Sequence, residues 1–224
     1  MTKFYLFDIE GTTTDIHFVH KVLFPYSKER LKEFVLKHQD RPDIVKDIEL
    51  VRETIWTEES KNPSIEEILE KLLYWIETDR KHPALKEIQG LIWEEGYARG
   101  DFKGHIYPDV KPAWDRILSE SKKIGIYSSG SVHAQKLIFR NSDSGDLTPF
   151  ISNYFDTKVG HKREKVSYET IARRTGFEPD EIKFFSDIPE ELEAALAAGL
   201  QVVHVVREGT KPSSFPMIQN FNLI

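Results

Sequence analysis

Residues 4–14 of the chain read FYLFDIEGTTT, and this stretch decides how the rest of the sequence is interpreted. Its first four residues are aromatic or aliphatic, which is typical of a short strand buried in a sheet. The strand is followed at once by two acids, a glycine and three threonines. Ligands of open α/β sheets bind at the carboxyl ends of the strands. We therefore expect Asp8 and Glu10 to lie at a functional site.

The composition is that of a soluble globular protein. The 224 residues are 39% hydrophobic and 30% charged, with no cysteine and a net charge of −6. Without cysteine the chain has no disulfide, no cysteine nucleophile and no thiolate metal site. An acidic chain is a poor match for nucleic acid, and no apolar run is long enough to span a membrane. Because Asp8 interrupts any signal-like N-terminal segment, we expect a cytoplasmic protein that binds neither nucleic acid nor a membrane.

Residues 17–100 have a different pattern from the rest of the chain. They contain no convincing strand, and their apolar residues recur every three or four positions, as on helices that face a core. Ser64, followed three residues later by Glu67, predicts a helix start with reciprocal capping. Three tryptophans of this region are expected to pack in its core: Trp56, Trp75 and Trp93. The region is therefore predicted to be an all-helical insert.

Strands and helices alternate after a Gly- and Pro-rich linker at residues 100–112. The strands expected there are residues 124–127, 154–155, 182–185 and 202–206. The helices expected there are residues 113–118, 132–140, 166–175 and 189–198. Such alternation predicts an α/β fold with a doubly wound parallel sheet. The predicted domains are an α/β core of residues 1–16 and 101–224 and a helical domain of residues 17–100.

Polar residues follow several of the predicted strands, and in a parallel sheet they would meet at one edge. They are Asp8 and Glu10 after the first strand, Ser128 and Ser129 after the second, Lys162 before a helix, and Asp187 after a later strand. Several carboxylates around one point repel each other unless a cation lies among them, and all-oxygen ligands favour Mg²⁺. Lysine and serine suit phosphate oxygens. A carboxylate can attack phosphorus while a second one transfers protons, so the set indicates metal-assisted phosphoryl transfer.

Each of these residues also has a purely structural interpretation. A single acid can be a solvated loop residue, and the serines of residues 128–131 can cap the following helix. Lys162 lies in a basic stretch that could be an exposed loop. Glu191, one turn after Asp187, lies where an acid favours the helix dipole, so its role stays open. Asp8 and Asp187 are the hardest to explain in this way, because each directly follows a buried strand.

The order of these motifs resembles that of the haloacid dehalogenase superfamily of phosphatases. The superfamily has Asp-x-Asp-Gly-Thr after its first strand, then a Ser or Thr, a Lys and a late acidic motif, and the helical insert falls where it places a cap domain. Within it, the strings DIEGTTTDIHFV, SSGSVHAQKLIF, FDTKVGHKRE and GHIYPDV closely resemble the enolase-phosphatase (acireductone synthase) family of methionine salvage. Glu10 stands where most members of the superfamily have a second Asp. Asp15 stands where that family commonly has Pro.

The resemblance implies a bifunctional reaction on a phosphorylated diketone. The enzyme would enolise 2,3-diketo-5-methylthiopentyl 1-phosphate and then hydrolyse the phosphate to give the acireductone. Asp8 would be the nucleophile and a Mg²⁺ ligand, and Glu10 the acid/base, also associated with the metal. Asp187 would be the remaining protein ligand of the metal. Ser128, Ser129 and Lys162 would bind substrate, in a protein that is monomeric and cytoplasmic.

Three other functions compete with this hypothesis. One is a plain small-molecule phosphatase of the same superfamily, and another is a phosphomutase that returns the phosphoryl group to its substrate. The third is a non-catalytic binding module, which the complete set of acids, hydroxyls and lysine disfavours. A dehalogenase is also disfavoured, because it would not need the acidic cluster.

Overall fold

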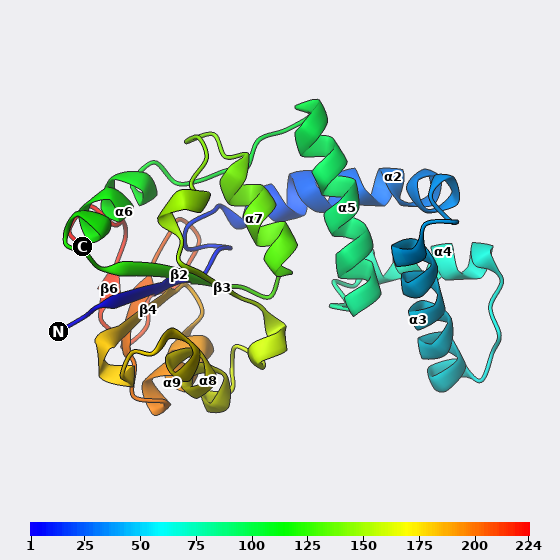
Figure 1. Cartoon of the computed structure of the whole chain (residues 1–224). Coiled ribbons are helices and arrows are strands. Elements are labelled where there is room, and N and C mark those ends of the chain that lie inside the picture. The colour runs from blue at the N-terminus through cyan, green and yellow to red at the C-terminus, as the bar shows by residue number, and fades with distance from the viewer. The chain divides into compact units, whose positions relative to one another are not determined.

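The computed structural model describes residues 1–224 and divides into two compact units. One unit combines Met1–Phe18 with Lys103–Ile224, and the other is Val19–Phe102. The first unit contains a sheet with helices around it, and the second contains helices only (Figure 1). The predicted fold class, α/β with a doubly wound parallel sheet, is confirmed.

All six strands of the sheet are parallel, in the order β3-β2-β1-β4-β5-β6. Their bounds are Asn153–Phe155 for β3, Lys123–Tyr127 for β2, Phe4–Phe7 for β1, Ile182–Ser186 for β4, Gln201–Val205 for β5 and Met217–Ile218 for β6. The last residue of β1, Phe7, lies opposite Ile126 of β2 and Phe185 of β4. The chain therefore leaves these three strands at nearly the same level. The strand order also changes direction around β1, which is where α/β sheets bind ligands.

Helices cover both faces of the sheet (Figure 1). Helices α6 (Val110–Ser119) and α7 (Val132–Arg140) lie on one face, and α8 (Lys165–Thr175) and α9 (Pro189–Ala197) lie on the other. Short helical segments fill the connections: α1 (Ile16–Phe18), η2 (Thr148–Phe150), η3 (Thr157–Val159) and η4 (Pro179–Glu181). The first turn of α6 begins before the predicted residue 113, since a helix tolerates Pro112 in its first turn.

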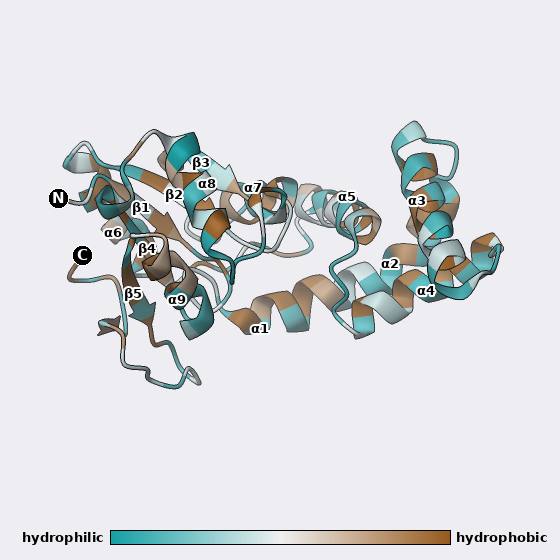
Figure 2. Cartoon of the chain, turned by 90° about the horizontal axis from the view of Figure 1, so that it is seen from below, coloured by the Kyte–Doolittle hydropathy of each residue, from teal (hydrophilic) through white to brown (hydrophobic).

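Strand β1 is buried on both faces because it is central in the sheet. Its alternate residues Phe4 and Leu6 join a core cluster with Phe184 of β4. On the other face, the ring of Phe7 lies 4.8 Å from that of Phe185 and 5.7 Å from that of Trp114 on α6. Figure 2 shows β1 and β4 largely in the colour of hydrophobic residues, whereas the helices mix hydrophobic and hydrophilic residues. The residues of β1 thus pack into the core on both faces of the sheet.

The helical unit begins with a π-helix, Val19–Leu23, and continues as α2 (Phe24–Lys37), α3 (Pro42–Glu59), α4 (Ile65–Glu77) and α5 (Pro83–Arg99). Trp75 is fully buried and Trp93 is buried, as predicted, but Trp56 is 60% exposed. The expectation for Trp56 was wrong. Ile48, Val51 and Ile55 form the buried stripe of α3, and Trp56 follows Ile55 by about 100° of helical rotation. Its ring therefore points away from the core.

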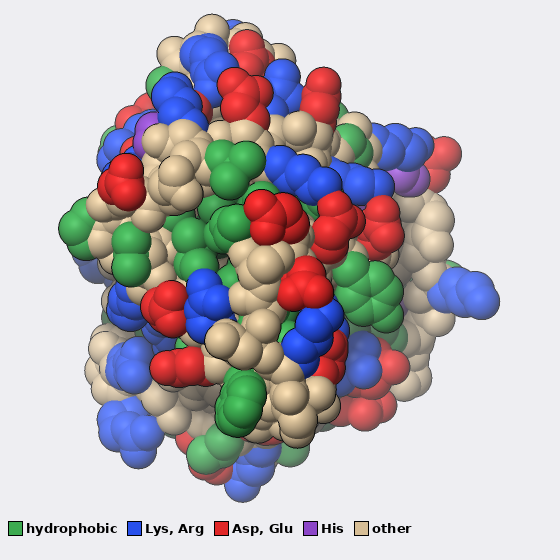
Figure 3. Space-filling model, turned by 90° about the vertical axis from the view of Figure 1, so that its right-hand side faces the viewer, with side chains coloured by type: hydrophobic (Ala, Val, Ile, Leu, Met, Phe, Trp, Pro, Cys, Tyr) green, Lys and Arg blue, Asp and Glu red, His purple; other side chains and the backbone are tan.

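Opposite charges are interspersed on the surface of the helical unit, as the view toward α3 and α4 shows (Figure 3). Many of them are paired, and Lys28–Glu77 at 2.8 Å is one example. Exposed pairs of this kind contribute little to stability. None of the helices combines the length and the apolar character needed to cross a bilayer.

The start of α4 is a capping box, as predicted. The Ser64 hydroxyl accepts a hydrogen bond from the Glu67 backbone N–H, and the Glu67 carboxylate accepts one from the Ser64 N–H at 2.9 Å. Two backbone donors that the helix leaves unpaired are thus satisfied.

We expect Ser64→Ala to lower the free energy of unfolding of the helical unit by about 1 kcal/mol, the usual cost of losing an N-cap. Ser64→Thr keeps a hydroxyl at the cap and should lose less than half as much. Urea unfolding followed by tryptophan fluorescence measures both. Equal losses in the two variants would show that the cap does not stabilise α4.

Candidate active site

A tight turn follows β1 and presents the first two acids. The N–H groups of Thr12, Thr13 and Thr14 all donate to the Ile9 carbonyl, at 3.2, 2.9 and 2.9 Å. The Thr13 hydroxyl donates to the Asp8 carbonyl at 3.1 Å. The three threonines are fully buried. The backbone N–H groups of the three threonines and the hydroxyl of Thr13 therefore build the turn that fixes Asp8, whereas the buried hydroxyls of Thr12 and Thr14 have no hydrogen-bond partner.

Gly11 is required in this turn for two reasons. Its φ of 70° lies in the left-handed region, which favours glycine. A Cβ atom on Gly11 would also lie 2.3 Å from Oδ2 of Asp187. The Asp187 carboxylate, which follows β4, thus lies directly against the turn that follows β1.

Lys162 links the nucleophile candidate to α9. Its buried Nζ lies 2.5 Å from Oδ1 of Asp8 and 2.6 Å from Oε2 of Glu191. Glu191 also accepts a hydrogen bond from the Ser186 hydroxyl at 2.8 Å. Glu191, left open by the sequence, is therefore part of the cluster and holds Lys162 in place.

Two tyrosines hold the backbone around Lys162, and the sequence did not single them out. The Tyr168 hydroxyl donates to the Lys162 carbonyl at 2.7 Å, and the Tyr127 hydroxyl donates to the Gly160 carbonyl at 3.0 Å. Tyr168 belongs to the apolar face of α8 and Tyr127 ends a buried strand. Only the need of a buried hydroxyl for a partner could have indicated them.

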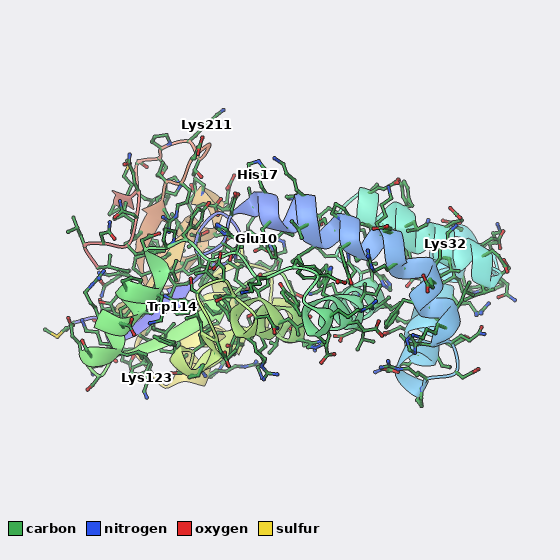
Figure 4. The ribbon with its side chains drawn as sticks, turned by 90° about the horizontal axis from the view of Figure 1, so that it is seen from above. Glu10, His17, Lys32, Trp114, Lys123 and Lys211 are labelled. Carbon is green, nitrogen blue, oxygen red and sulfur yellow. The ribbon has the colours of Figure 1, made fainter.

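The serines after β2 separate into two groups. The Ser128 hydroxyl donates to Oε2 of Glu10 at 3.3 Å and accepts from the Gly130 N–H at 3.1 Å. Ser129 is half-buried beside it. Ser131 accepts from the Ala134 N–H and caps α7, so it has the structural role considered for it. Figure 4 places Glu10 at the end of the α/β unit away from Lys123, where β2 begins.

The electrostatic environment of the site is dominated by burial and by several carboxylates. Burial raises the pKa of Asp8 well above its usual range, Lys162 opposes this, and three neighbouring carboxylates add to it. Burial and neighbouring carboxylates likewise raise the pKa of Asp187 to about 7, against the effect of Lys162. Burial alone would lower the pKa of Lys162, but the two carboxylates that it contacts outweigh burial and raise it.

The structure brings all but one of the predicted site residues into this network. Asp8, Glu10, Ser128, Lys162 and Asp187 are joined by hydrogen bonds, ion pairs or close electrostatic contacts. Ser129 is half-buried next to Ser128 in the sequence, and no hydrogen bond joins it to the acids. Lys162 is buried, whereas Lys158 and Lys165 are exposed, so the lysine of the site differs clearly from the basic residues around it.

The donor set fits a divalent cation. Oδ1 of Asp187 is buried without a hydrogen-bond partner, which is costly for a carboxylate unless a cation binds it. No three acidic or histidine side chains converge as a ready metal cluster, since Glu10 turns to Ser128 and Glu191 to Lys162. The bonds that close the turn use the carbonyls of Ile9 and Thr14 but not that of Glu10. The side chains of Asp8 and Asp187 and the Glu10 carbonyl thus remain as hard oxygen donors.

Comparison with known proteins agrees with this chemistry. Residues 2–199 match the model of the haloacid dehalogenase-like hydrolases. The protein named enolase-phosphatase E1 of Sulfurihydrogenibium sp. (strain YO3AOP1) is 48% identical over 221 residues, covering 99% of this chain and 93% of the relative. That of Cronobacter sakazakii (strain ATCC BAA-894) is 46% identical, covering 99% and 96%. Phosphatases of this kind generally use a divalent metal.

A solved structure gives the same result. The crystal structure of the UTR4 protein of Saccharomyces cerevisiae superposes with a TM-score of 0.78 at 32% identity, covering the full length of both chains. The family match, the relatives and the geometry of the acids after β1 and β4 all agree. The chain is a haloacid dehalogenase-like hydrolase and, within that superfamily, a member of the enolase-phosphatase family.

Proposed function

We propose that this protein converts 2,3-diketo-5-methylthiopentyl 1-phosphate to the acireductone 1,2-dihydroxy-3-keto-5-methylthiopentene and phosphate, in methionine salvage. The observation that carries the proposal is the buried Asp8 carboxylate, which Lys162 holds at 2.5 Å while the unpartnered Oδ1 of Asp187 lies in the same cluster. The chain is also 48% identical over nearly its full length to a protein named enolase-phosphatase.

Hydrolysis would proceed through covalent catalysis at Asp8. A carboxylate oxygen of Asp8 attacks phosphorus, the bond from phosphorus to the substrate oxygen breaks, and an aspartyl phosphate forms. Glu10, on the same turn, donates a proton to the departing oxygen. Water then attacks phosphorus and gives a proton to the Glu10 carboxylate, while the bond from phosphorus to Asp8 breaks, which frees the Asp8 carboxylate and releases phosphate. Since Lys162 already contacts Asp8, its charge would also stabilise the phosphoryl oxygens, with Ser128 and Ser129 as further partners.

Mg²⁺ is the metal that we assign to the site. Asp8, Glu10 and Asp187 would hold it, because these residues supply only oxygen ligands, which Mg²⁺ prefers. The bound ion would supply positive charge to the phosphoryl and carbonyl oxygens.

Enolisation requires a base next to the acidic carbon. Two carboxylates are candidates, Asp8 and Glu10, and both lie on the turn after β1. Glu10 is half-buried and held by one hydrogen bond of 3.3 Å, so it is freer to move than Asp8. A longer side chain that can move between the leaving oxygen and a carbon acid fits a reaction with two proton transfers.

The helical region, residues 17–100, would serve as the cap of this enzyme. Its position in the sequence supports the proposal, since the chain enters it soon after the acidic turn and returns through the linker at residues 100–112. A cap excludes water from a reactive enediol. We further propose that the protein acts as a monomer.

One experiment separates this function from a plain phosphatase. The protein is incubated with the diketo phosphate and Mg²⁺, and enediol absorbance and phosphate are followed together. We expect both signals. Phosphate release without the enediol signal, at a rate similar to that on simple sugar phosphates, would identify a phosphatase without enolase activity.

Removal of the metal should abolish the reaction. We expect exhaustive treatment with EDTA to reduce phosphate release to background and added Mg²⁺ to restore it, because Oδ1 of Asp187 is buried without a partner and Lys162 pairs only with Asp8 and Glu191. A phosphate assay measures both steps, with circular dichroism as the control for folding. Full activity after chelation would exclude the metal assignment.

Lys162→Ala should impair substrate binding and catalysis together. The variant removes the charge that stabilises the phosphoryl group and Asp8, so kcat/KM should fall by about 10²–10³-fold. Lys158→Ala, in the same stretch but exposed, is the matched control and should behave as the unmodified protein. An inactive Lys158→Ala beside an active Lys162→Ala would show that the wrong lysine was assigned.

Asp8→Asn should separate the two chemical steps. Without the nucleophile, phosphate release should fall by several orders of magnitude, on the order of 10⁴-fold or more. Enolisation does not need attack on phosphorus, so the enol phosphate should accumulate at a slower but measurable rate.

Glu10→Gln should block leaving-group protonation and, if Glu10 is the carbon base, enolisation too. Single-turnover spectroscopy at saturating Mg²⁺ with a parallel phosphate assay measures both signals. If Asp8→Asn lost both enol formation and phosphate release with metal still bound, the idea that enolisation can proceed without the Asp8 carboxylate would be falsified.

A further inference from the structure

A buried arginine on the backbone side of the acidic turn has no part in the chemistry described above. Arg207 follows β5 by two residues, and its side chain is only 8% exposed. A buried guanidinium normally requires full pairing, because its desolvation is costly. The contacts of Arg207 meet this requirement and show what it holds.

Each of its donors has a partner. Nε and Nη2 donate to the Thr12 carbonyl at 3.2 and 3.0 Å. Nη1 donates to Oδ1 of Asp109 at 3.1 Å and to the Gln219 carbonyl at 3.2 Å, and Nη2 lies 2.9 Å from Oδ2 of Asp109. Four of these contacts are hydrogen bonds and the fifth is an ion pair, so all three nitrogens of the guanidinium have a partner. The geometry therefore uses the whole planar fork of the arginine.

These partners come from three separate segments of the α/β unit. Thr12 belongs to the turn that carries Asp8 and Glu10, Asp109 to the linker before α6, and Gln219 to the C-terminal tail. The same Asp109 accepts from the Phe221 N–H at 2.7 Å. The guanidinium also lies over the ring of Tyr107, 4.1 Å from its centroid. Tyr107 in turn donates its N–H to the Thr13 carbonyl at 3.0 Å.

We propose that Arg207 is a positioning residue for the nucleophile, acting through the Thr12 carbonyl. The Thr12 N–H is bonded to the Ile9 carbonyl, so a shift of Thr12 moves the backbone next to Asp8. The inference rests on the proposed function, in which Asp8 attacks phosphorus. Attack requires the carboxylate oxygen within a fraction of an ångström of its place, and a misplacement of about 1 Å can cost about 10²-fold in rate.

Arg207→Lys is the test variant. Lysine keeps a positive charge against Asp109, so the buried carboxylate is not left unpaired, but one ammonium cannot reach Thr12, Asp109 and Gln219 in the same plane. Arg116→Lys is the matched control. Arg116 donates to the tail carbonyls of Phe221 and Ile224, at 2.7 and 3.1 Å, and makes no contact with the acidic turn.

The readout is the kcat and KM of phosphate release, with thermal unfolding measured for each variant. We expect kcat of Arg207→Lys to fall about 10- to 100-fold while KM changes less than about threefold, because the substrate contacts remain. Arg116→Lys should keep kcat within about twofold, even though it loosens the same tail. Asp109→Asn, which keeps an acceptor for the guanidinium, should lower kcat by a smaller factor in the same direction.

Two results would overturn the proposal. One is a kcat of folded Arg207→Lys within about twofold of the unmodified protein. The other is an equal loss in Arg116→Lys, which would show that order in the tail suffices. If Arg207→Lys does not fold, an unchanged kcat in Asp109→Asn overturns the proposal instead.

The assay is run on the diketo phosphate and on p-nitrophenyl phosphate. If the unmodified protein is active only on p-nitrophenyl phosphate, the proposed function is contradicted. The effect of Arg207→Lys on kcat can then still be measured with p-nitrophenyl phosphate.

Discussion

The contact between the buried Lys162 ammonium and the carboxylates of Asp8 and Glu191 is the constraint on which the site depends. An acid that follows β1 and an acid on α9 need a cation between them to share a buried space as anions. Satisfying that need fixes the backbone after β3, where Tyr168 and Tyr127 hold the carbonyls of residues 162 and 160. Because β1 is central in the sheet, its acid lies next to groups that follow β4 and precede α8.

Lys162 does not neutralise all the charge around it. Asp8 also interacts electrostatically with Glu10 and Asp187, so the cluster holds four carboxylates and one ammonium, which contacts Asp8 and Glu191. The repulsion, together with burial, raises the pKa of Asp187 to about 7. A carboxylate with a raised pKa has an ionised form that is destabilised, and a divalent cation restores that form by lowering the pKa. A divalent cation would therefore stabilise the carboxylates of this cluster as anions, which agrees with the general use of a divalent metal by related phosphatases.

Sequence reasoning succeeded where a local pattern carried the information. The apolar run FYLF and the acid after it predicted the central strand and Asp8, and the spacing of Ser64 and Glu67 predicted a capping box. It failed where a long-range partner decides. The exposure of Trp56 depends on which side of α3 packs against α5 and α4. The spacing of apolar residues in the sequence does not show that Trp56 lies just outside the buried stripe of α3. Glu191 could not be assigned because its partner, Lys162, is distant in the sequence. Tyr168 could not be assigned because it binds the backbone carbonyl of Lys162, which no side-chain pattern reveals.

The two acids of the turn are held to different degrees, and the difference matches what the proposed chemistry asks of each. Asp8 is almost fully buried, its side chain is bonded to Lys162, and its carbonyl accepts from Thr13. The turn is also held from behind by Arg207. Glu10 is half-buried and has a single long hydrogen bond to Ser128. A nucleophile gains rate from being fixed, since attack depends on distance and direction. A group that transfers protons to two different atoms must be able to move between them, so the same turn combines a rigid position with an adaptable one.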